Sequence, residues 1–164
     1  MKIQGRAHLL GDFLNTDMHF TNKYKYEGKG VEFLAQHVLE DIDPHYPNRI
    51  QSGDILVGGT NFGATSTREQ AVKVMRRLAI GAVLAKSFSR LFYRNALNNG
   101  LPAFQCDTSD IKNGDSVEID TASGEIVVAE GRQIIQVRPL PPLLQALVSS
   151  GELLSFVKAH PDWR

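Results

Sequence analysis

The chain has 164 residues, a length that suits one domain with a complete hydrophobic core. Its 18 Lys and Arg residues equal its 18 Asp and Glu residues, so it lacks the basic excess that is typical of nucleic-acid-binding proteins. No apolar run reaches the roughly 20 residues that a membrane-spanning helix needs, and the first residues lack the apolar stretch of a signal peptide. We therefore expect a cytoplasmic protein that binds neither nucleic acid nor membranes.

The single cysteine, Cys106, excludes a disulfide within the chain and any zinc or iron–sulfur site built from several of its own cysteines. The five histidines do not follow a metal-ligand spacing such as H-E-x-x-H. We predict that Cys106 is a small, half-buried apolar residue. Any metal or cluster that the protein uses would then be held by another molecule.

The predicted elements begin with a strand at the N-terminus, which leads into the loop GDFLNTD at residues 11–17. Apolar residues at helical spacing predict a helix over residues 31–42. Two prolines then indicate a loop. The apolar run DILVGG, residues 54–59, predicts a strand that is covered on both faces.

A βαβ unit follows from this strand. The apolar stripe of residues 69–80 predicts a helix that ends at Gly81, and AVLAKSF at residues 82–88 predicts a second buried strand. Strand, helix and strand within about thirty residues indicate two parallel strands with a right-handed crossover.

The second half of the chain changes from parallel to antiparallel elements. Residues 89–100 predict a helix that turns Leu91 and other apolar residues inward and ends at Gly100, and residues 101–106 predict a third short strand. Further strands, two of them joined by a TASG hairpin, and closing helices are predicted at residues 115–120, 124–130, 132–140 and 141–160. We predict a single α/β domain over residues 1–164, with a parallel central element and a smaller antiparallel part.

Glycines and hydrogen-bond donors are concentrated in the loop GGTNFGATSTRE, residues 58–69, between a predicted strand and a helix. Ligands bind at such strand ends in open α/β sheets, and a helix start offers unpaired N–H groups and partial positive charge to an anion. The loop has neither the lysine of a Walker A motif nor the G-x-G-x-x-G spacing. A carboxylate or another small anion is therefore favoured over a nucleotide.

Two interpretations of TSTR, residues 65–68, stay open on the pattern alone. Ser66 with Glu69, or Thr67 with Gln70, fits a capping box that would only begin the helix. Arg68 in the first helical turn is disfavoured by the helix dipole by roughly 0.3–1 kcal/mol. It is either a solvated surface residue or a bidentate ligand for an anion.

The segments GDFLNTDM, GTNFGATSTREQA and AKSFSRLFYRNALNNGLPA, together with the closing LPPLLQALVSSGELLSFVK, resemble the small subunits of aconitase-type hydro-lyases. The resemblance covers nearly the whole chain. It implies a swivelling β/β/α three-layer domain and a separate large subunit that carries a [4Fe–4S] cluster. It also implies a lyase, active only with that partner, that moves the hydroxyl of a 2-hydroxy di- or tricarboxylic acid by dehydration and rehydration.

The same resemblance implies roles for individual residues. Ser66 takes the place of the catalytic base, and Arg68 takes that of the arginine that binds a substrate carboxylate. Thr65, Thr67 and Asn61 are further substrate-binding candidates. The segment after Asn-Thr-Asp would contact the variable arm of the substrate, here through the tetrad Lys23, Tyr24, Lys25 and Tyr26.

The substrate and even the class of function stay open at this point. An apolar arm would indicate 3-isopropylmalate dehydratase of leucine biosynthesis; lysines that bind a further carboxylate would indicate homoaconitase, and dimethylmalate dehydratase is a further alternative. A non-catalytic carboxylate-binding or regulatory module is the alternative from another class. The chain departs from the family pattern at Thr65, Thr67, Gln70 and Met18. Because Thr65 replaces a glycine, a positive φ is not expected there.

Overall fold

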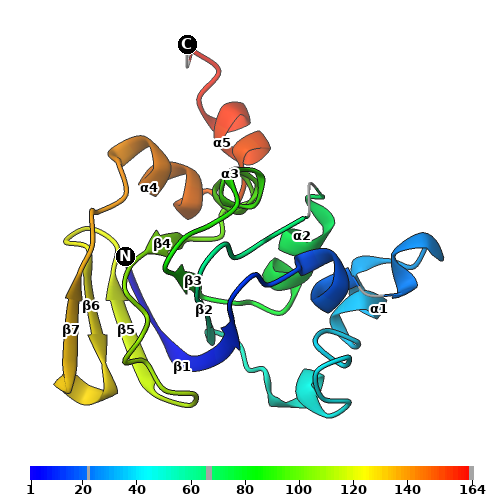
Figure 1. The fold of residues 1–164 in the computed structure, drawn as a ribbon. Coiled ribbons are helices and arrows are strands. Elements are labelled where there is room, and N and C mark those ends of the chain that lie inside the picture. Colours follow the sequence, from blue (N-terminus) through cyan, green and yellow to red (C-terminus); the bar gives the residue numbers. More distant parts are fainter. Residues whose placement is uncertain (22, 66–67, 163–164) are drawn as a thin grey trace.

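The computed structural model describes residues 1–21, 23–65 and 68–162. Within these residues the strands form one mixed sheet with the order β4-β3-β2-β1-β5-β6-β7 (Figure 1). The strands are β1 (Lys2–Gly11), β2 (Ile55–Gly58), β3 (Ala82–Ala85), β4 (Ala103–Gln105), β5 (Ser116–Asp120), β6 (Glu125–Val128) and β7 (Gln133–Gln136). The helices are α1 (Val31–Ala35), α2 (Gln70–Arg77), α3 (Arg90–Asn98), α4 (Pro142–Ser149) and α5 (Leu153–Ala159), with short helical turns η1 (Asp17–Thr21), η2 (Lys23–Tyr26), η3 (Tyr46–Arg49) and η4 (Ala129–Gly131).

Strand β1 joins the two parts of the sheet. It runs parallel to β2, with Ala7 opposite Ile55, and antiparallel to β5, with Lys2 opposite Asp120. β3 and β4 continue the parallel part, whereas β6 and β7 continue the antiparallel part. This arrangement confirms the predicted α/β class with a parallel central element and a smaller antiparallel part.

Strands β2 and β3 are buried along their whole length, as their apolar sequences predict. Successive side chains point to opposite faces, so Leu56 packs in the core beneath α1 and α2, while Ile55 and Val57 pack in the core against β5, β6 and α4. Figure 1 shows α1 and α2 on one side of β2 and the curled strands β5–β7 on the other. The βαβ unit therefore lies between two apolar layers.

The prediction of a helix over residues 31–42 is wrong for the second half of this range. α1 ends at Ala35, and Leu39 has a φ of 57°, outside the range of a right-handed helix. The N–H of Leu39 donates to the carbonyl of His19 at 2.6 Å instead of continuing the helical ladder. A contact with a distant part of the chain thus overrides the local periodicity.

The end of α2 also differs from the prediction, because Gly81 does not terminate it. The helix ends at Arg77, and Ala79 takes the left-handed conformation with a φ of 55°. Its N–H donates to Arg76, and the N–H of Ile80 donates to Met75, which is the Schellman pattern of helix ends. Alanine therefore occupies a position that usually holds glycine.

Gly81 is instead required by a close approach of the backbone. A Cβ atom at this position would lie 2.6 Å from the carbonyl oxygen of Gly53 and 2.8 Å from Cγ2 of Ile3. The N–H of Gly81 donates to the carbonyl of Asp54 at 2.9 Å, so the chain before β3 lies directly against the turn before β2. The glycine permits this contact rather than ending a helix.

The third helix is confirmed, with one wrong assignment. α3 buries Phe92, Ala96 and Leu97, and Gly100 has the positive φ of a helix end. Leu91, expected to face inward, is 47% exposed.

The prediction that Cys106 is a small, half-buried apolar residue is confirmed. Cys106 is partly buried and packs against the core that contains β5 and β6. Burial, together with the neighbouring Asp107, raises the pKa of its thiol to about 11.

Substituting Gly81 by alanine tests the close approach. We expect Gly81→Ala to lower the free energy of unfolding by about 1–3 kcal/mol, because the obstructing atoms are mainly backbone and have to move. Urea denaturation followed by circular dichroism measures the change. Ala79→Gly, two residues away, is the matched control and should cause no loss, because glycine adopts a positive φ readily. Equal stability of Gly81→Ala and the parent chain would contradict the packing described here.

Candidate functional site

Three loops lie at one edge of the parallel part of the sheet. Residues 12–17 follow β1, residues 59–69 follow β2, and residues 86–89 follow β3. Because these strands are parallel neighbours, their carboxyl ends meet at the same edge (Figure 1). This edge is where ligands bind in open α/β sheets, and it contains the loop that the sequence singles out.

Backbone hydrogen bonds join the first two loops. The N–H of Phe13 donates to the carbonyl of Thr60 at 2.7 Å. The carbonyl of Leu14 accepts from the N–H groups of Gly63 and Ala64, both at 3.0 Å. The GDFLNTD segment therefore fixes the path of the loop that leads to residues 66–68.

Gly59 and Asp12 add a side-chain bond to this contact. Oδ1 of Asp12 accepts from the N–H of Thr60 at 2.5 Å. A Cβ atom on Gly59 would lie only 1.9 Å from that oxygen. Glycine is therefore needed at position 59 for Asp12 to hold the loop.

The third loop supports the second from the other side. Oγ of Ser87 accepts from the N–H of Asn61 at 2.8 Å, and the carbonyl of Ser87 accepts from the N–H of Phe62 at 2.9 Å. Oγ of Ser89 donates to the carbonyl of Gly63 at 2.8 Å. The predicted substrate-binding residue Asn61 thus lies half-buried in the loop, with its backbone held by Ser87.

Thr65 contradicts the expectation for its backbone. Its φ is 63°, so it takes the left-handed conformation despite the replacement of glycine by threonine. A positive φ is strained for a β-branched residue, by roughly 1–3 kcal/mol. The conformation associated with glycine is therefore present here at an energetic cost, on the residue directly before the predicted base.

The predicted catalytic residue Ser66 and its neighbour Thr67 lie outside the described residues. The helix after them begins at Gln70, and its N-cap position falls on Glu69, without a side-chain cap bond. The predicted capping bonds of Ser66 and Thr67 therefore also lie outside the described residues. Glu69 accepts from Asn99 at 2.8 Å and pairs with Lys73 at 3.0 Å, and these partners lower the pKa of its carboxyl group.

Arg68 precedes the N-cap and so is not in the first helical turn, contrary to the prediction. Its Nε lies 3.8 Å from Oδ2 of Asp17, and one of its Nη atoms lies 3.5 Å from the hydroxyl oxygen of Tyr26. Its Cζ lies 5.1 Å from the centre of the Tyr26 ring, within cation–π range. The guanidinium is partly exposed, with an acid and an aromatic ring beside it.

Of the predicted specificity tetrad, Tyr26 lies beside Arg68, whereas Lys23 and Tyr24 contact each other. Tyr26 contacts Arg68 and is 74% exposed. Tyr24 packs edge-on against the ring of Phe33, and Nζ of Lys23 lies 5.0 Å from the Tyr24 ring and 3.7 Å from Glu40. The side chain of Lys25 lies outside the described part.

Asp17 is the contact of Arg68 that sequence reasoning missed. The sequence places Asp17 in the loop GDFLNTD and indicates no further role for it. Asn15 helps to shape this loop, because its side chain accepts from the N–H of Met18 at 3.1 Å. The sequence signal that could have identified Asp17 is its place in the loop after the first predicted strand, because loops at the carboxyl ends of parallel strands meet at one edge of a sheet.

Neither a metal centre nor a membrane span was found in what the structure describes. Among residues 1–21, 23–65 and 68–162, no group of three His, Cys, Asp or Glu side chains is arranged to hold a metal ion. None of the helices described above is both long and apolar enough to cross a membrane.

Comparisons with known proteins agree with the motifs. The model of the aconitase C-terminal domain matches residues 2–108. The 3-isopropylmalate dehydratase small subunit 2 of Archaeoglobus fulgidus is 40% identical over 162 residues, which cover 99% of this chain and 98% of that protein. The 3-isopropylmalate dehydratase small subunit of Moorella thermoacetica is 42% identical over 159 residues, which cover 96% of this chain and 95% of that protein.

A solved structure agrees in fold as well. The crystal structure described as 3-isopropylmalate dehydratase (leuD) from Methanocaldococcus jannaschii superposes with a TM-score of 0.89 at 38% identity. The match covers 98% of this chain and 96% of that one. These findings confirm the resemblance that the motifs indicated.

A double substitution tests the contact between the first two loops. We expect Gly59→Ala to reduce the free energy of unfolding by about 0.5–1.5 kcal/mol, because the new methyl group forces Asp12 to give up its bond to Thr60. In an Asp12→Ala background the same change should have almost no effect, since that bond is already lost. Denaturant unfolding of the four proteins measures both effects. Additive losses would show that Gly59 and Asp12 do not act through one contact.

Proposed function

Because this chain belongs to the family of aconitase C-terminal domains, we propose that it is the small subunit of a 3-isopropylmalate dehydratase, a two-subunit hydro-lyase of leucine biosynthesis. The observation that carries this proposal is the identity of about 40%, over nearly the full length, to proteins that bear this name. The small-subunit names support a large-subunit partner.

The resemblance assigns a [4Fe–4S] cluster to that partner. The residues of this chain do not fit such a cluster, which requires several thiolate ligands. The chain has one cysteine, and burial and Asp107 raise the pKa of its thiol to about 11. We therefore assign to this chain the binding of substrate and the movement of a proton, and not the ligation of the cluster.

In this proposal Ser66 removes the proton. A serine hydroxyl is a weak acid, so its anionic form requires nearby positive charge and hydrogen-bond donors. The start of α2, which follows Ser66 in the chain, supplies unpaired N–H groups, and Arg68, two residues after Ser66, supplies a cation. Proton transfer by a positioned base contributes about a hundred- to ten-thousand-fold to the rate.

Arg68 is proposed to bind a carboxylate of the substrate. A guanidinium matches the two oxygens of a carboxylate with two parallel hydrogen bonds. The contacts with Asp17 and Tyr26 support this role, because they restrict the orientation of the guanidinium before substrate arrives. Thr65, Thr67 and Asn61 are proposed to contribute further contacts from the same loop.

The choice of 3-isopropylmalate over a tricarboxylate rests on large exposed side chains in the segment that follows β1. Phe13 on the loop (64% exposed), Met18 on η1 (54%) and Tyr26 on η2 (74%) are apolar or aromatic, although Asp12 and Lys23 are exposed in the same segment. Lys23, a candidate for binding an additional carboxylate, lies beside Tyr24 and Glu40. This environment favours an isopropyl group over a further negative charge.

Reconstitution with the cluster-bearing large subunit tests the proposal. Ser66→Ala is expected to lower kcat of the complex toward 3-isopropylmalate by about a hundred-fold or more. The assay follows the absorbance of the unsaturated intermediate, with homocitrate, dimethylmalate and citrate compared side by side.

Ser109→Ala, which changes an exposed serine elsewhere on the surface, is the matched control and should leave kcat unchanged. Full activity of Ser66→Ala would remove the serine from the mechanism. A chain that binds carboxylates but supports no turnover with the large subunit would favour the non-catalytic module.

A lysine at position 68 separates the charge of the arginine from its geometry. We expect Arg68→Lys to raise KM by about tenfold or more, with a smaller effect on kcat, because lysine keeps the charge but cannot form two parallel bonds. Steady-state kinetics of the same complex measures both parameters. Arg77→Lys, which alters an arginine paired with Glu32 on the surface, is the control. If KM stayed constant while kcat fell, Arg68 would not serve in substrate binding.

A further inference from the structure

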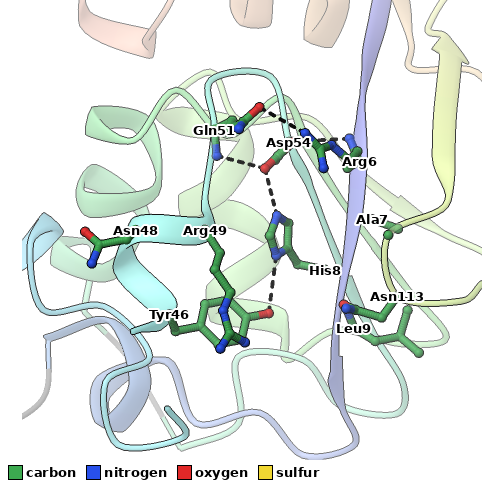
Figure 2. A pocket seen from close by; sticks show the side chains of 11 residues that line it. Arg6, Ala7, His8, Leu9, Tyr46, Asn48, Arg49, Gln51, Asp54 and Asn113 are labelled. Atoms are coloured by element: carbon green, nitrogen blue, oxygen red, sulfur yellow. Dashed lines mark hydrogen bonds and ion pairs between the residues drawn. The ribbon is translucent and has the colours of Figure 1, made fainter. Parts of the chain in front are cut away.

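A second group of polar side chains lies at the opposite end of β2 from the TSTR loop. It lines a pocket of about 470 Å³ between β1, η3, the residues just before β2 and the turn at residues 113–114 (Figure 2). The volume falls within the range of small-molecule sites. None of the residues proposed to act on 3-isopropylmalate lines this pocket.

The inner wall of the pocket is a connected line of three side chains. Nε2 of His8 lies 2.7 Å from Oδ2 of Asp54, and Nδ1 of His8 lies 3.3 Å from the hydroxyl oxygen of Tyr46. His8 therefore lies between the acid and the phenol, as Figure 2 shows. Both ring nitrogens of His8 therefore have partners within the chain, and the three side chains form a fixed wall.

The negative charge of Asp54 is covered and satisfied. The residue is only 4% exposed, and its carboxylate accepts from the N–H groups of Gln51 at 2.8 Å and Arg6 at 3.2 Å, besides contacting His8. Burial alone would raise the pKa of Asp54, but these hydrogen bonds outweigh it and hold the pKa below its ordinary value. Asp54 therefore contributes little negative charge to the open part of the pocket.

The open part of the pocket carries two arginines. Arg49 is paired with Asp43, and its Cζ lies 5.8 Å from the centre of the Tyr46 ring. Within the described chain the guanidinium of Arg6 donates to the amide oxygen of Gln51, at 3.4 Å, and has no carboxylate within ion-pair distance. The accessible surface of the pocket is therefore cationic.

We propose that this pocket binds a small anion, a phosphate or a carboxylate, through Arg6, with Arg49 beside it and the row of Tyr46, His8 and Asp54 as the inner wall. The planar guanidinium of Arg6 suits two oxygens of one anionic group. The bond between His8 and Asp54 has a structural explanation, because it fixes the turn before β2 onto β1. The same explanation does not extend to Arg6, which lies over the pocket without an acidic partner in the described chain.

Nuclear magnetic resonance of the full chain tests the site with two probes, inorganic phosphate and malate, each added at constant ionic strength. We expect saturable shifts of the amide signals of Arg6, Gln51 and Asn113. Arg6→Gln should weaken the binding of the tighter probe about tenfold or more, because it removes a charged pair of hydrogen bonds. Arg6→Lys should restore part of the affinity through charge alone. Comparing the two probes distinguishes a phosphate site from a carboxylate site.

Two controls separate this site from other anion binding. Arg68→Gln should leave the shifts around Arg6 unchanged, since Arg68 lies beyond the other end of β2. Lys158→Gln on α5 removes one positive charge elsewhere and should also have no effect. The absence of saturable shifts at the pocket for both probes would overturn the proposal, and so would equal affinities of Arg6→Gln and the parent chain. The dispersion of the amide spectrum shows that each variant is folded.

Discussion

The hydrogen bonds between the loop after β1 and the loop after β2 determine where the proposed site lies. Because the two strands are parallel neighbours, both loops emerge at one edge of the sheet. The carbonyl of Leu14 accepts two N–H groups, those of Gly63 and Ala64, and Asp12 holds Thr60. These contacts bring Asp17, near the N-terminus, within 3.8 Å of Arg68. Without them the arginine would have no partner from the first segment of the chain.

The loop after β2 contains two residues with a strained backbone. Asn61 and Thr65 both have positive φ values, of 55° and 63°. Non-glycine residues persist in this conformation only where their surroundings impose it, and such residues are frequent at functional sites. Here the surroundings are identifiable: Phe62 lies between them, fully buried, and its N–H and carbonyl both bond to the loop after β3. Burying one aromatic side chain thus helps to hold the two strained residues that flank it.

The sequence predicts the centre of the molecule better than its connections. β2, α2 and β3 follow from apolar runs and one helical stripe, because a strand covered on both faces and a helix packed on it leave a local pattern. The end of α1 does not follow, since it depends on a bond between Leu39 and His19, which are far apart in the chain. The sequence pattern predicts a helix end at Gly81, but this glycine permits a close backbone contact with Gly53. That contact depends on the position of Gly53 in the fold, which the sequence does not show.

The features of the candidate site also divide into those that the sequence predicts and those that it does not. The donor-rich loop and its family resemblance identify Ser66 and Arg68 as candidates, because these signals are contiguous in the sequence. The neighbours of Arg68 come from other segments: Tyr26 lies 42 residues before it, on η2. The positive φ of Thr65 was not predictable from its residue type, because β-branched side chains disfavour that conformation. Contacts across the loops, and not local preference, decide both features.

Formal neutrality, finally, describes the whole chain and not its local surfaces. The equal numbers of acids and bases argue against a broad basic face, which is what nucleic acids require. They say little about a single arginine, because charges in water are screened over about 8 Å at physiological ionic strength. Arg6 and Arg68 belong to opposite ends of β2, whose four residues span about 13 Å at the usual rise of a strand. Each arginine therefore acts mainly on the groups beside it. A neutral chain can in this way hold one cation for a proposed substrate and another for a separate anion.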